Sequence, residues 1–309
     1  MIVSLPEAPT SRSVIPAVRD DPVGHVLATP LEQPVARPLV EAATQNMMRA
    51  LLSGFLHEPP LAHWYRRGYA LAGMPLAFHE IFARLLARLE GRVSLDHPML
   101  GTAPSVQDLP EWVSSLYQMC RRLLPAAGSP QLEVSAPQSQ LGCGLPWAVR
   151  RLAEEMRDHK GLQLYLHGSL ATCDATAYSD VDTLLVVSHN WLESGDRAGE
   201  LQRVVSRAQR WLYRFDPLQH HGFMLVTELA LDRYASWYFP LELVTYAYAL
   251  GGRRPLHYRV RASEEENVSL LRRLCANLDR LESGEVSGPQ TRYALKAVLS
   301  DILLLPIYY

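Results

Sequence analysis

Hydrophobic residues recur with a helical period through the first part of the chain, after a proline-rich start. Six prolines interrupt residues 1–36. Because proline disfavours both helix interiors and central strands, this stretch is predicted to be an extended arm. Over 37–125, apolar side chains return every three to four residues, which is the spacing of one helix face. The pattern predicts a helical region with helices at 39–55, 76–90 and 109–124.

The pattern changes after this region. Residues 126–146 are rich in Pro, Gly, Ser and Gln, which predicts a linker. The next part, 147–260, alternates helical and strand periods, which indicates an α/β core with its strands confined to the middle of the chain. The expected strands are 162–167, 181–187 and 222–227, and the expected helices are 147–159, 196–214, 229–250, 263–282 and 290–305. The region 261–309 is expected to pack on the core as helices.

Composition and charge narrow the class of protein. The 309 residues are 48% hydrophobic and 20% charged, as in globular proteins. A net charge of −2 provides no general attraction to nucleic acid or anionic membranes, so a long nucleic-acid partner is disfavoured unless a local basic groove exists. No apolar stretch is long enough to span a membrane and no signal peptide is visible, so a cytoplasmic location is expected. The four cysteines form no CxxC pair and are expected to be reduced thiols.

Candidate chemistry is concentrated in two short motifs. A predicted strand ends in Gly168-Ser169, and the next predicted strand opens with Asp180-Val181-Asp182. Since side chains alternate along a strand, the two aspartates should project to one side while Val181 faces the core. Paired carboxylates suit Mg²⁺ or Mn²⁺, which complete their ligand shell with water and substrate phosphates. The pattern predicts Asp180 and Asp182 as metal ligands.

The Gly-Ser turn could bind the phosphate groups that accompany such a metal ion. Gly168 has no Cβ, so phosphate groups can approach its backbone closely. Ser169 adds a hydroxyl and a backbone N–H, and both could bind an anion. Gly168 and Ser169 are therefore predicted to bind the phosphates of a nucleotide.

The order of these motifs resembles a known family. An apolar strand, Gly-Ser, ten intervening residues and Asp-apolar-Asp-apolar are similar to the signature of the polymerase-β-like nucleotidyltransferase superfamily, over roughly residues 160–230. The resemblance implies a small mixed sheet with flanking helices. It also implies a transferase that moves an NMP from an NTP such as ATP to an acceptor, with Mg²⁺ or Mn²⁺, and releases pyrophosphate. The acceptor is left open among an RNA end, a protein, a small molecule and a second nucleotide.

One part of the family pattern is missing. These enzymes usually carry a third acid on a later strand, yet the predicted strand 222–227 contains no carboxylate. Asp216 precedes this strand and Glu228 follows it, and neither position matches the pattern. This gap motivates the alternative of a catalytically weakened nucleotidyltransferase fold that acts as a nucleotide-binding or protein-interaction module. A helical scaffold with a purely structural α/β part is a further alternative.

A histidine could occupy the place of the third acid. His221 shares a strand face with Phe223 and Leu225, and its ring can accept a proton near pH 7. It is the predicted third catalytic residue. A histidine that only satisfies hydrogen bonds at the strand start explains the position equally, and the same alternatives apply to His220.

Two further residues are candidates for nucleotide binding. Ser179 precedes Asp180 and could orient its side chain, although a turn also favours serine. Lys296 lies four residues after Arg292 on the predicted helix 290–305, so the two could form one positive stripe facing a triphosphate. A surface lysine is the competing interpretation.

Overall fold

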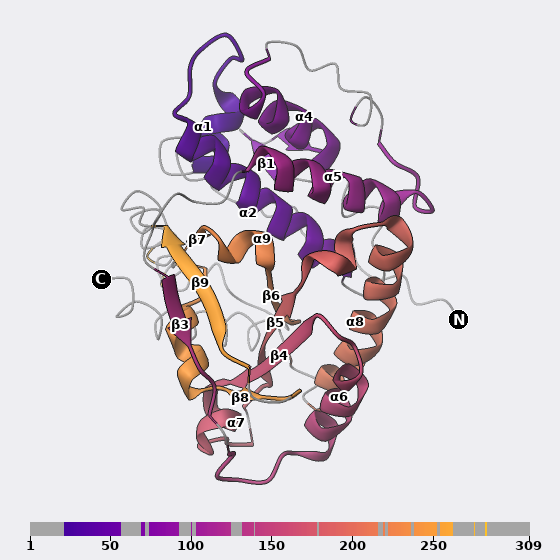
Figure 1. Cartoon of the computed structure of the whole chain (residues 1–309), viewed down its shortest axis with the longest axis vertical. Coiled ribbons are helices and arrows are strands. Elements are labelled where there is room, and N and C mark those ends of the chain that lie inside the picture. Colours follow the sequence, from indigo (N-terminus) through magenta and orange to yellow (C-terminus); the bar gives the residue numbers. More distant parts are fainter. Residues whose placement is uncertain are drawn as a thin grey trace.

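The computed structural model places a layer of helices above a sheet-containing core (Figure 1). It describes residues 22–56, 69–71, 74–92, 100, 103–124, 132–138, 140–177, 179–215, 219, 222–235, 238–251 and 254–261, with residues 275 and 282. The predicted helices at 263–282 and 290–305 fall almost entirely outside these residues.

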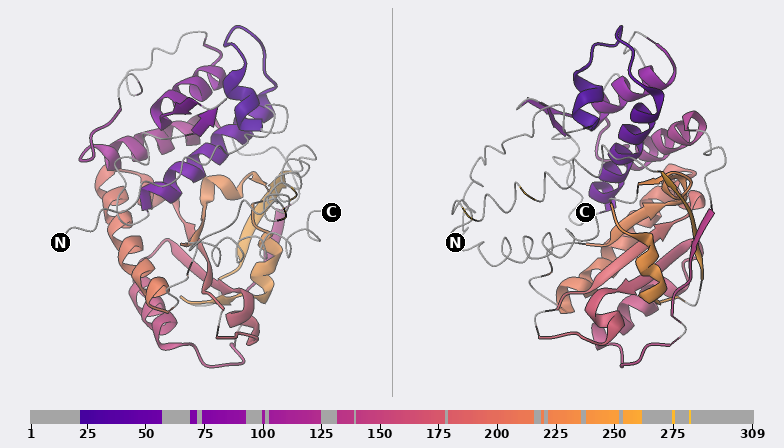
Figure 2. Two further views of the ribbon diagram at one scale, coloured as in Figure 1. Left: turned by 180° about the vertical axis from the view of Figure 1, so that it is seen from behind. Right: turned by 90° about the vertical axis from the view of Figure 1, so that its left-hand side faces the viewer.

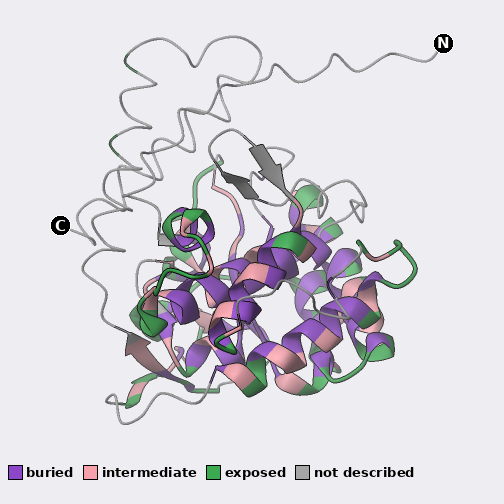
Figure 3. Cartoon of the chain, turned by 90° about the horizontal axis from the view of Figure 1, so that it is seen from above, coloured by how far each residue is buried: buried purple, intermediate pink, exposed green. Residues whose placement is uncertain are grey.

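The upper layer contains the predicted helical region. Each of the three predicted helices is confirmed, with bounds that differ by a few residues from the expectation. They are α2 (Arg37–Leu56), α4 (Phe78–Leu89) and α5 (Leu109–Leu123), and a short hairpin of β1 (Tyr69–Leu71) and β2 (Met74–Leu76) precedes α4. Their apolar faces are buried against one another, as expected for amphipathic helices (Figure 3).

The proline-rich start is not an extended arm throughout. Residues Pro22–Ala28 form helix α1, with the proline at the first helical position, where its missing N–H costs nothing. Val23, Val26 and Leu27 follow the helical spacing and are buried in the same hydrophobic cluster as α2. The prediction is wrong over 22–28 because a proline at the first position of a helix does not disfavour that helix. Residues 1–21 lie outside the described part.

The core contains a mixed sheet in the order β6-β5-β4-β8. Strand β4 pairs antiparallel with β5 and with β8, whereas β5 pairs parallel with β6, so the expected α/β fold with a small mixed sheet is confirmed. The strands are β4 (Leu162–His167), β5 (Asp182–Val187), β6 (Met224–Thr227) and β8 (Tyr248–Ala249).

The two faces of this sheet are covered by different elements. Helices α6 (Trp147–Arg157) and α8 (Gly195–Phe215) cover one face, on the right in Figure 1 and seen from behind in Figure 2. Leu185 and Val187 belong to the hydrophobic cluster on this face, which continues into the upper helices. Leu184 and Val186 alternate to the other face and belong to a second cluster.

That second face is covered by a small sheet that the sequence did not predict. Its order is β3-β9-β7, formed by β3 (Leu132–Ser135), β9 (Leu256–Arg261) and β7 (Tyr234–Ala235). The predicted linker therefore contains a strand, and strands are not confined to the middle of the chain. β9 and β3 do alternate apolar and polar residues, so the sequence analysis overlooked a strand pattern there, whereas β7 has only two residues and shows no period. β3 and β9 pair with each other across a long stretch of sequence.

The expected helix over 229–250 is also wrong. This stretch contains the four-residue α9 (Glu228–Leu231), then β7, the 3₁₀ helix η3 (Leu241–Tyr246) and β8. Pro240 precedes η3 and would interrupt a continuous helix. Across the described residues, no helix is both long and apolar enough to cross a membrane.

Candidate functional site

The antiparallel pairing of β4 with β5 brings the Gly-Ser turn next to one of the aspartates. His167, the last residue of β4, lies opposite Asp182, the first residue of β5. Gly168 follows directly and has φ +65°, a left-handed conformation that favours glycine. A Cβ on Gly168 would lie 3.2 Å from Cγ and 3.3 Å from Cβ of Asp182. Glycine is thus required both by the backbone conformation and by the close approach of the Asp182 side chain.

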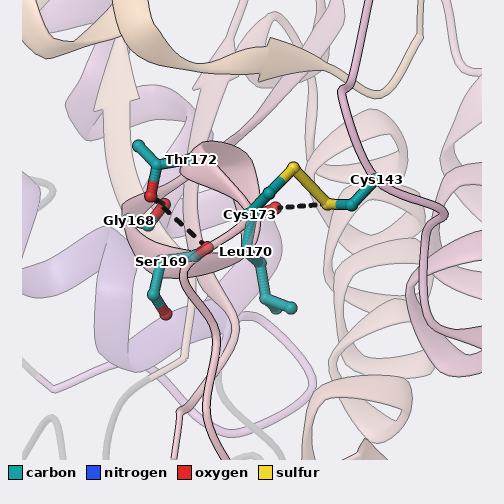
Figure 4. The surroundings of a disulfide bond; sticks show 6 residues. All are labelled: Cys143, Gly168, Ser169, Leu170, Thr172 and Cys173. Atoms are coloured by element: carbon teal, nitrogen blue, oxygen red, sulfur yellow. Dashed lines mark hydrogen bonds between the residues drawn. A yellow bond between two sulfur atoms is a disulfide. The ribbon is translucent and has the colours of Figure 1, made fainter.

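The turn continues into the short helix α7 (Gly168–Thr172) (Figure 4). Leu170 and Ala171 are buried and anchor it, while Gly168 is exposed and Ser169 is half-buried. The backbone N–H of Asp174 donates to the Ser169 carbonyl at 2.9 Å and closes the turn. The two residues predicted to bind phosphate thus lie on the accessible side of a turn held from below by apolar side chains.

The two aspartates flank a buried anchor. Val181 is fully buried, whereas Asp180 and Asp182 are each half-buried. β5 begins at Asp182, so Asp180 precedes the strand rather than lying within it. Asp182 is two residues before Leu184 and four before Val186, so its side chain projects to the same face of β5 as theirs. That face is the one covered by the small sheet.

Gln219, which the sequence analysis did not identify, holds the backbone between the two aspartates in place. The side-chain amide of Gln219 accepts a hydrogen bond from the N–H of Val181 at 3.1 Å and donates one to its carbonyl at 3.2 Å. Gln219 is 4% exposed, so both bonds are shielded from water. A single glutamine in a loop carries no periodicity or motif, and no sequence signal could have identified it.

Ser179 stabilises a turn. Its hydroxyl accepts a hydrogen bond from the N–H of Thr176 at 2.9 Å and lies 3.4 Å from the Thr176 hydroxyl. These bonds close the loop that leads into Asp180. Ser179 therefore shapes the approach to the aspartates through the backbone.

Glu228 is separated from the aspartates by the length of a strand. It follows Thr227, which lies opposite Val187 at the far end of β5. At about 3.3 Å per residue, that end lies about 16 Å from Asp182. The Glu228 carboxylate accepts a hydrogen bond from the N–H of His189 at 2.7 Å and lies 3.8 Å from Nε2 of that residue. Glu228 thus stabilises the start of the 3₁₀ helix η2 (His189–Leu192).

The other candidates for the third catalytic group, and the predicted triphosphate contact Lys296, are not placed by the structure. Asp216, His220, His221 and Lys296 lie outside the described residues. Phe223 and Leu225, whose strand face His221 was predicted to share, pack in the cluster beneath α8, opposite the face of Asp182. Among the described residues, no group of three or more His, Cys, Asp or Glu side chains could hold a metal.

A disulfide adjoins the Gly-Ser turn and corrects the expectation of reduced thiols. Cys173 caps α7 in a left-handed conformation and is bonded to Cys143, with 5.7 Å between the Cα atoms (Figure 4). The pairing could not be read from the sequence because the two residues are 30 positions apart. Cys120 and Cys275 are free, and burial raises the pKa of the Cys120 thiol to about 12.

A comparison with protein families finds a match for the region that contains the Gly-Ser turn and the two aspartates. Residues 149–215 match the family model described as a nucleotidyltransferase domain. The matched region runs from α6 to the end of α8 and includes Gly168, Ser169, Asp180 and Asp182. No curated protein and no solved structure matched the chain. The chain thus carries, over residues 149–215, a nucleotidyltransferase domain of the polymerase-β-like superfamily.

Proposed function

We propose that the chain is a metal-dependent nucleotidyltransferase that moves an NMP from an NTP, with ATP as the first candidate, to an acceptor. The observation that carries the proposal is the contact of Gly168 with Asp182 inside the matched domain. It joins the phosphate-binding turn and a metal-binding carboxylate in one place. In this reaction an acceptor oxygen bonds to the α-phosphorus, the bond to the bridging oxygen breaks, and pyrophosphate leaves.

The donor set fits Mg²⁺ or Mn²⁺. Two carboxylates separated by one residue are half-buried, beside a turn that is open to phosphates. Mg²⁺ is commonly held by one or two protein carboxylates together with substrate phosphates and water. When bound, the ion would neutralise charge on the triphosphate. Asp180 and Asp182 are the residues proposed to hold it.

The chain's own residues divide the remaining tasks. Gly168 leaves room for the Asp182 carboxylate, and Ser169 offers a hydroxyl and a backbone N–H to phosphate oxygens. Gln219 holds Val181 and thereby the spacing of the two aspartates. Lys296 is proposed as a triphosphate contact, and Ser179 as an indirect contributor through its turn. His221 is proposed as the acceptor-activating base, a role that requires it to depart from the alternation of Phe223 and Leu225, which lie on the face opposite Asp182.

A specific observation favours a second candidate function. Glu228 is bonded to His189 at the far end of the sheet, and the described part of β6 carries no carboxylate. A nucleotidyltransferase fold that lacks the third ligand would bind a nucleotide with little turnover. The competing proposal is therefore a catalytically weakened fold that acts as a nucleotide-binding or protein-interaction module.

Transfer of label from an NTP labelled at the α-phosphate tests the two proposals. The protein would be incubated with each NTP, Mg²⁺ or Mn²⁺, and RNA, protein, nucleotide and small-molecule acceptors. We expect metal-dependent transfer that falls by about 100-fold or more in Asp180→Asn and in Asp182→Asn, since each variant removes a carboxylate charge proposed to hold the metal. Asp174→Asn, an exposed acid just after α7, should retain parental activity.

The other outcomes are equally informative. Metal-dependent nucleotide binding without transfer to any acceptor would favour the binding module. Absence of metal-dependent nucleotide binding would contradict both proposals. The cytoplasmic location is also part of the proposal, and because disulfides are typical of oxidising compartments, cell fractionation with thiol trapping is its direct test.

A further inference from the structure

A groove with a basic lining lies at the edge of the core sheet, away from the Gly-Ser turn. β8 pairs with Tyr165 and Leu166 in the second half of β4. The groove lies beside the first half of β4, next to the end of β8. The empty space between its walls, open solvent included, is about 490 Å³. The polar side chains that line it come from the end of α6, the start of β4 and the loop after β8: Arg157, His159, Lys160, Gln163, Tyr165 and Arg254.

The charges in this groove are of one sign. Arg157, Lys160 and Arg254 are all exposed, and no carboxylate occurs among the described residues that line the groove. The chain as a whole has a net charge of −2, so this is a local concentration of positive charge. Arg157 also lies in the last turn of α6, where a cation is favourable, but Lys160 and Arg254 lie outside any helix. The helix dipole therefore does not account for the cluster.

Buried aromatic residues fix the backbone from which two of these cations extend. The indole Nε1 of Trp191 donates to the Lys160 carbonyl at 2.9 Å. The hydroxyl of Tyr165 donates to the Arg254 carbonyl at 3.1 Å and lies 2.7 Å from Oε1 of Gln163. Trp191 and Tyr165 are at most 2% exposed, so the anchoring bonds lie against the hydrophobic core. The backbone positions of Lys160 and Arg254 are therefore built into the fold.

From this arrangement we infer that the groove binds the phosphate backbone of a single-stranded polynucleotide. Separated cations on long side chains neutralise successive phosphates without reading sequence. The only aromatic ring in the described lining, apart from the histidine, is the buried Tyr165, so base stacking contributes little. Binding should be independent of sequence because contacts to phosphates carry no sequence information. Sites for small nucleotides usually surround the ligand with apolar and aromatic side chains, whereas this groove presents exposed cations from three separate segments of the chain, which suits a run of phosphates.

This site is distinct from the proposed transfer site. Gln163 in the groove and His167 beside Asp182 are four residues apart on β4, about 13 Å at strand spacing. The inference does not rest on the proposed transfer reaction. Binding can be measured without NTP or metal, so failure of one leaves the other standing.

The test is the salt dependence of binding to a fluorescent single-stranded RNA. A mixed sequence of about 20 nucleotides exceeds the length of typical single-strand sites. Affinity would be measured between about 50 and 200 mM salt for the full chain and for Arg157→Gln, Lys160→Gln, Arg254→Gln and the triple variant. Arg203→Gln, an exposed arginine on α8, makes the same charge change elsewhere.

We expect the triple variant to lose about tenfold or more in affinity and each single variant to lower the salt slope by about 0.7. Arg203→Gln should leave both unchanged, and thermal unfolding should show that all variants fold. Equal RNA affinity of the parent and the triple variant, or no RNA binding by the parent, would overturn the inference. Displacement of RNA by inorganic tripolyphosphate at equal phosphate concentration would also overturn it, because the groove would then be a small-anion site.

Discussion

The side-chain amide of Gln219 pairs with the backbone of Val181 as a neighbouring strand would, accepting from its N–H and donating to its carbonyl. β6 is described as a strand from Met224, which lies opposite Leu184, so the aspartates precede the described ladder between β5 and β6. Gln219 supplies the missing pairing there. Because Val181 separates Asp180 from Asp182, the glutamine controls how the two carboxylates are presented.

Replacing Gln219 by leucine should weaken metal-dependent nucleotide binding. The variant loses two buried hydrogen bonds, each worth about 1 kcal/mol, and frees the backbone between the aspartates. We expect nucleotide affinity in the presence of Mg²⁺ to fall by about tenfold, measured by titration calorimetry. Gln209→Leu removes another buried glutamine from α8 and should cost stability without changing nucleotide affinity. Equal affinities of the two variants would show that Gln219 has only a structural role.

Two effects of replacing Gly168 can be measured separately: the strain of its left-handed backbone conformation and the contact of a new Cβ with Asp182. Gly168→Ala forces alanine into a left-handed backbone conformation, at about 1–2 kcal/mol, and places a methyl group against Asp182. Gly91→Ala imposes a similar φ, +67°, but its Cβ meets nothing within 4 Å. Urea unfolding should show both variants destabilised, whereas only Gly168→Ala should lose nucleotide binding. If Gly168→Ala bound nucleotide like the parent, the turn would not be the phosphate site.

Reduction of the disulfide should destabilise the chain. A bridge that spans a sequence separation of 30 contributes about 3–4 kcal/mol by restricting the unfolded state. Thermal unfolding with and without a thiol reductant should therefore differ for the parent. The double variant Cys143→Ser/Cys173→Ser should unfold at the lower temperature in both conditions. A parent whose unfolding temperature ignores the reductant would show that the bridge does not form in solution.

The sequence predicted the contacts between residues of one motif but not the contacts between residues that are far apart along the chain. Gly168 and Asp182 were predictable because strand alternation and a fixed motif spacing place both at one end of adjacent strands. Gln219 and the partner of Cys143 were not, because each interacts with a distant residue and neither lies in a periodic pattern.

The same distinction applies to the fold. α2, α4 and α5 have long apolar faces that determine them locally, and the sequence predicted all three. β3 and β7 exist through pairing with β9, which lies far along the chain from β3. Strands of two and four residues are too short for a local pattern to determine them, so they depend on tertiary contacts.

A pH-dependent stability is expected from His189, at the end of the sheet opposite the aspartates. Its Nδ1 lies 2.7 Å from the Tyr117 hydroxyl. Burial lowers the pKa of His189, the positive charge of Arg121 adds to this effect, and the Glu228 carboxylate partly opposes it. The folded state therefore favours the neutral ring. Its stabilising contribution is complete above the unfolded pKa of about 6.5 and is lost as the pH falls below that value, because the unfolded chain takes up the proton first.

The prediction is measured by urea unfolding between about pH 7.5 and pH 5.5. The free energy of unfolding of the parent should fall more steeply with acid than that of His189→Asn, which has no imidazole to protonate. His25→Asn, at an exposed position of α1, should follow the parent. Parallel pH profiles for the parent and His189→Asn would assign the acid sensitivity to other groups. Since His189 and Glu228 lie at the end of β5 that is about 16 Å from Asp182, nucleotide affinity of His189→Asn at pH 7.5 should equal that of the parent.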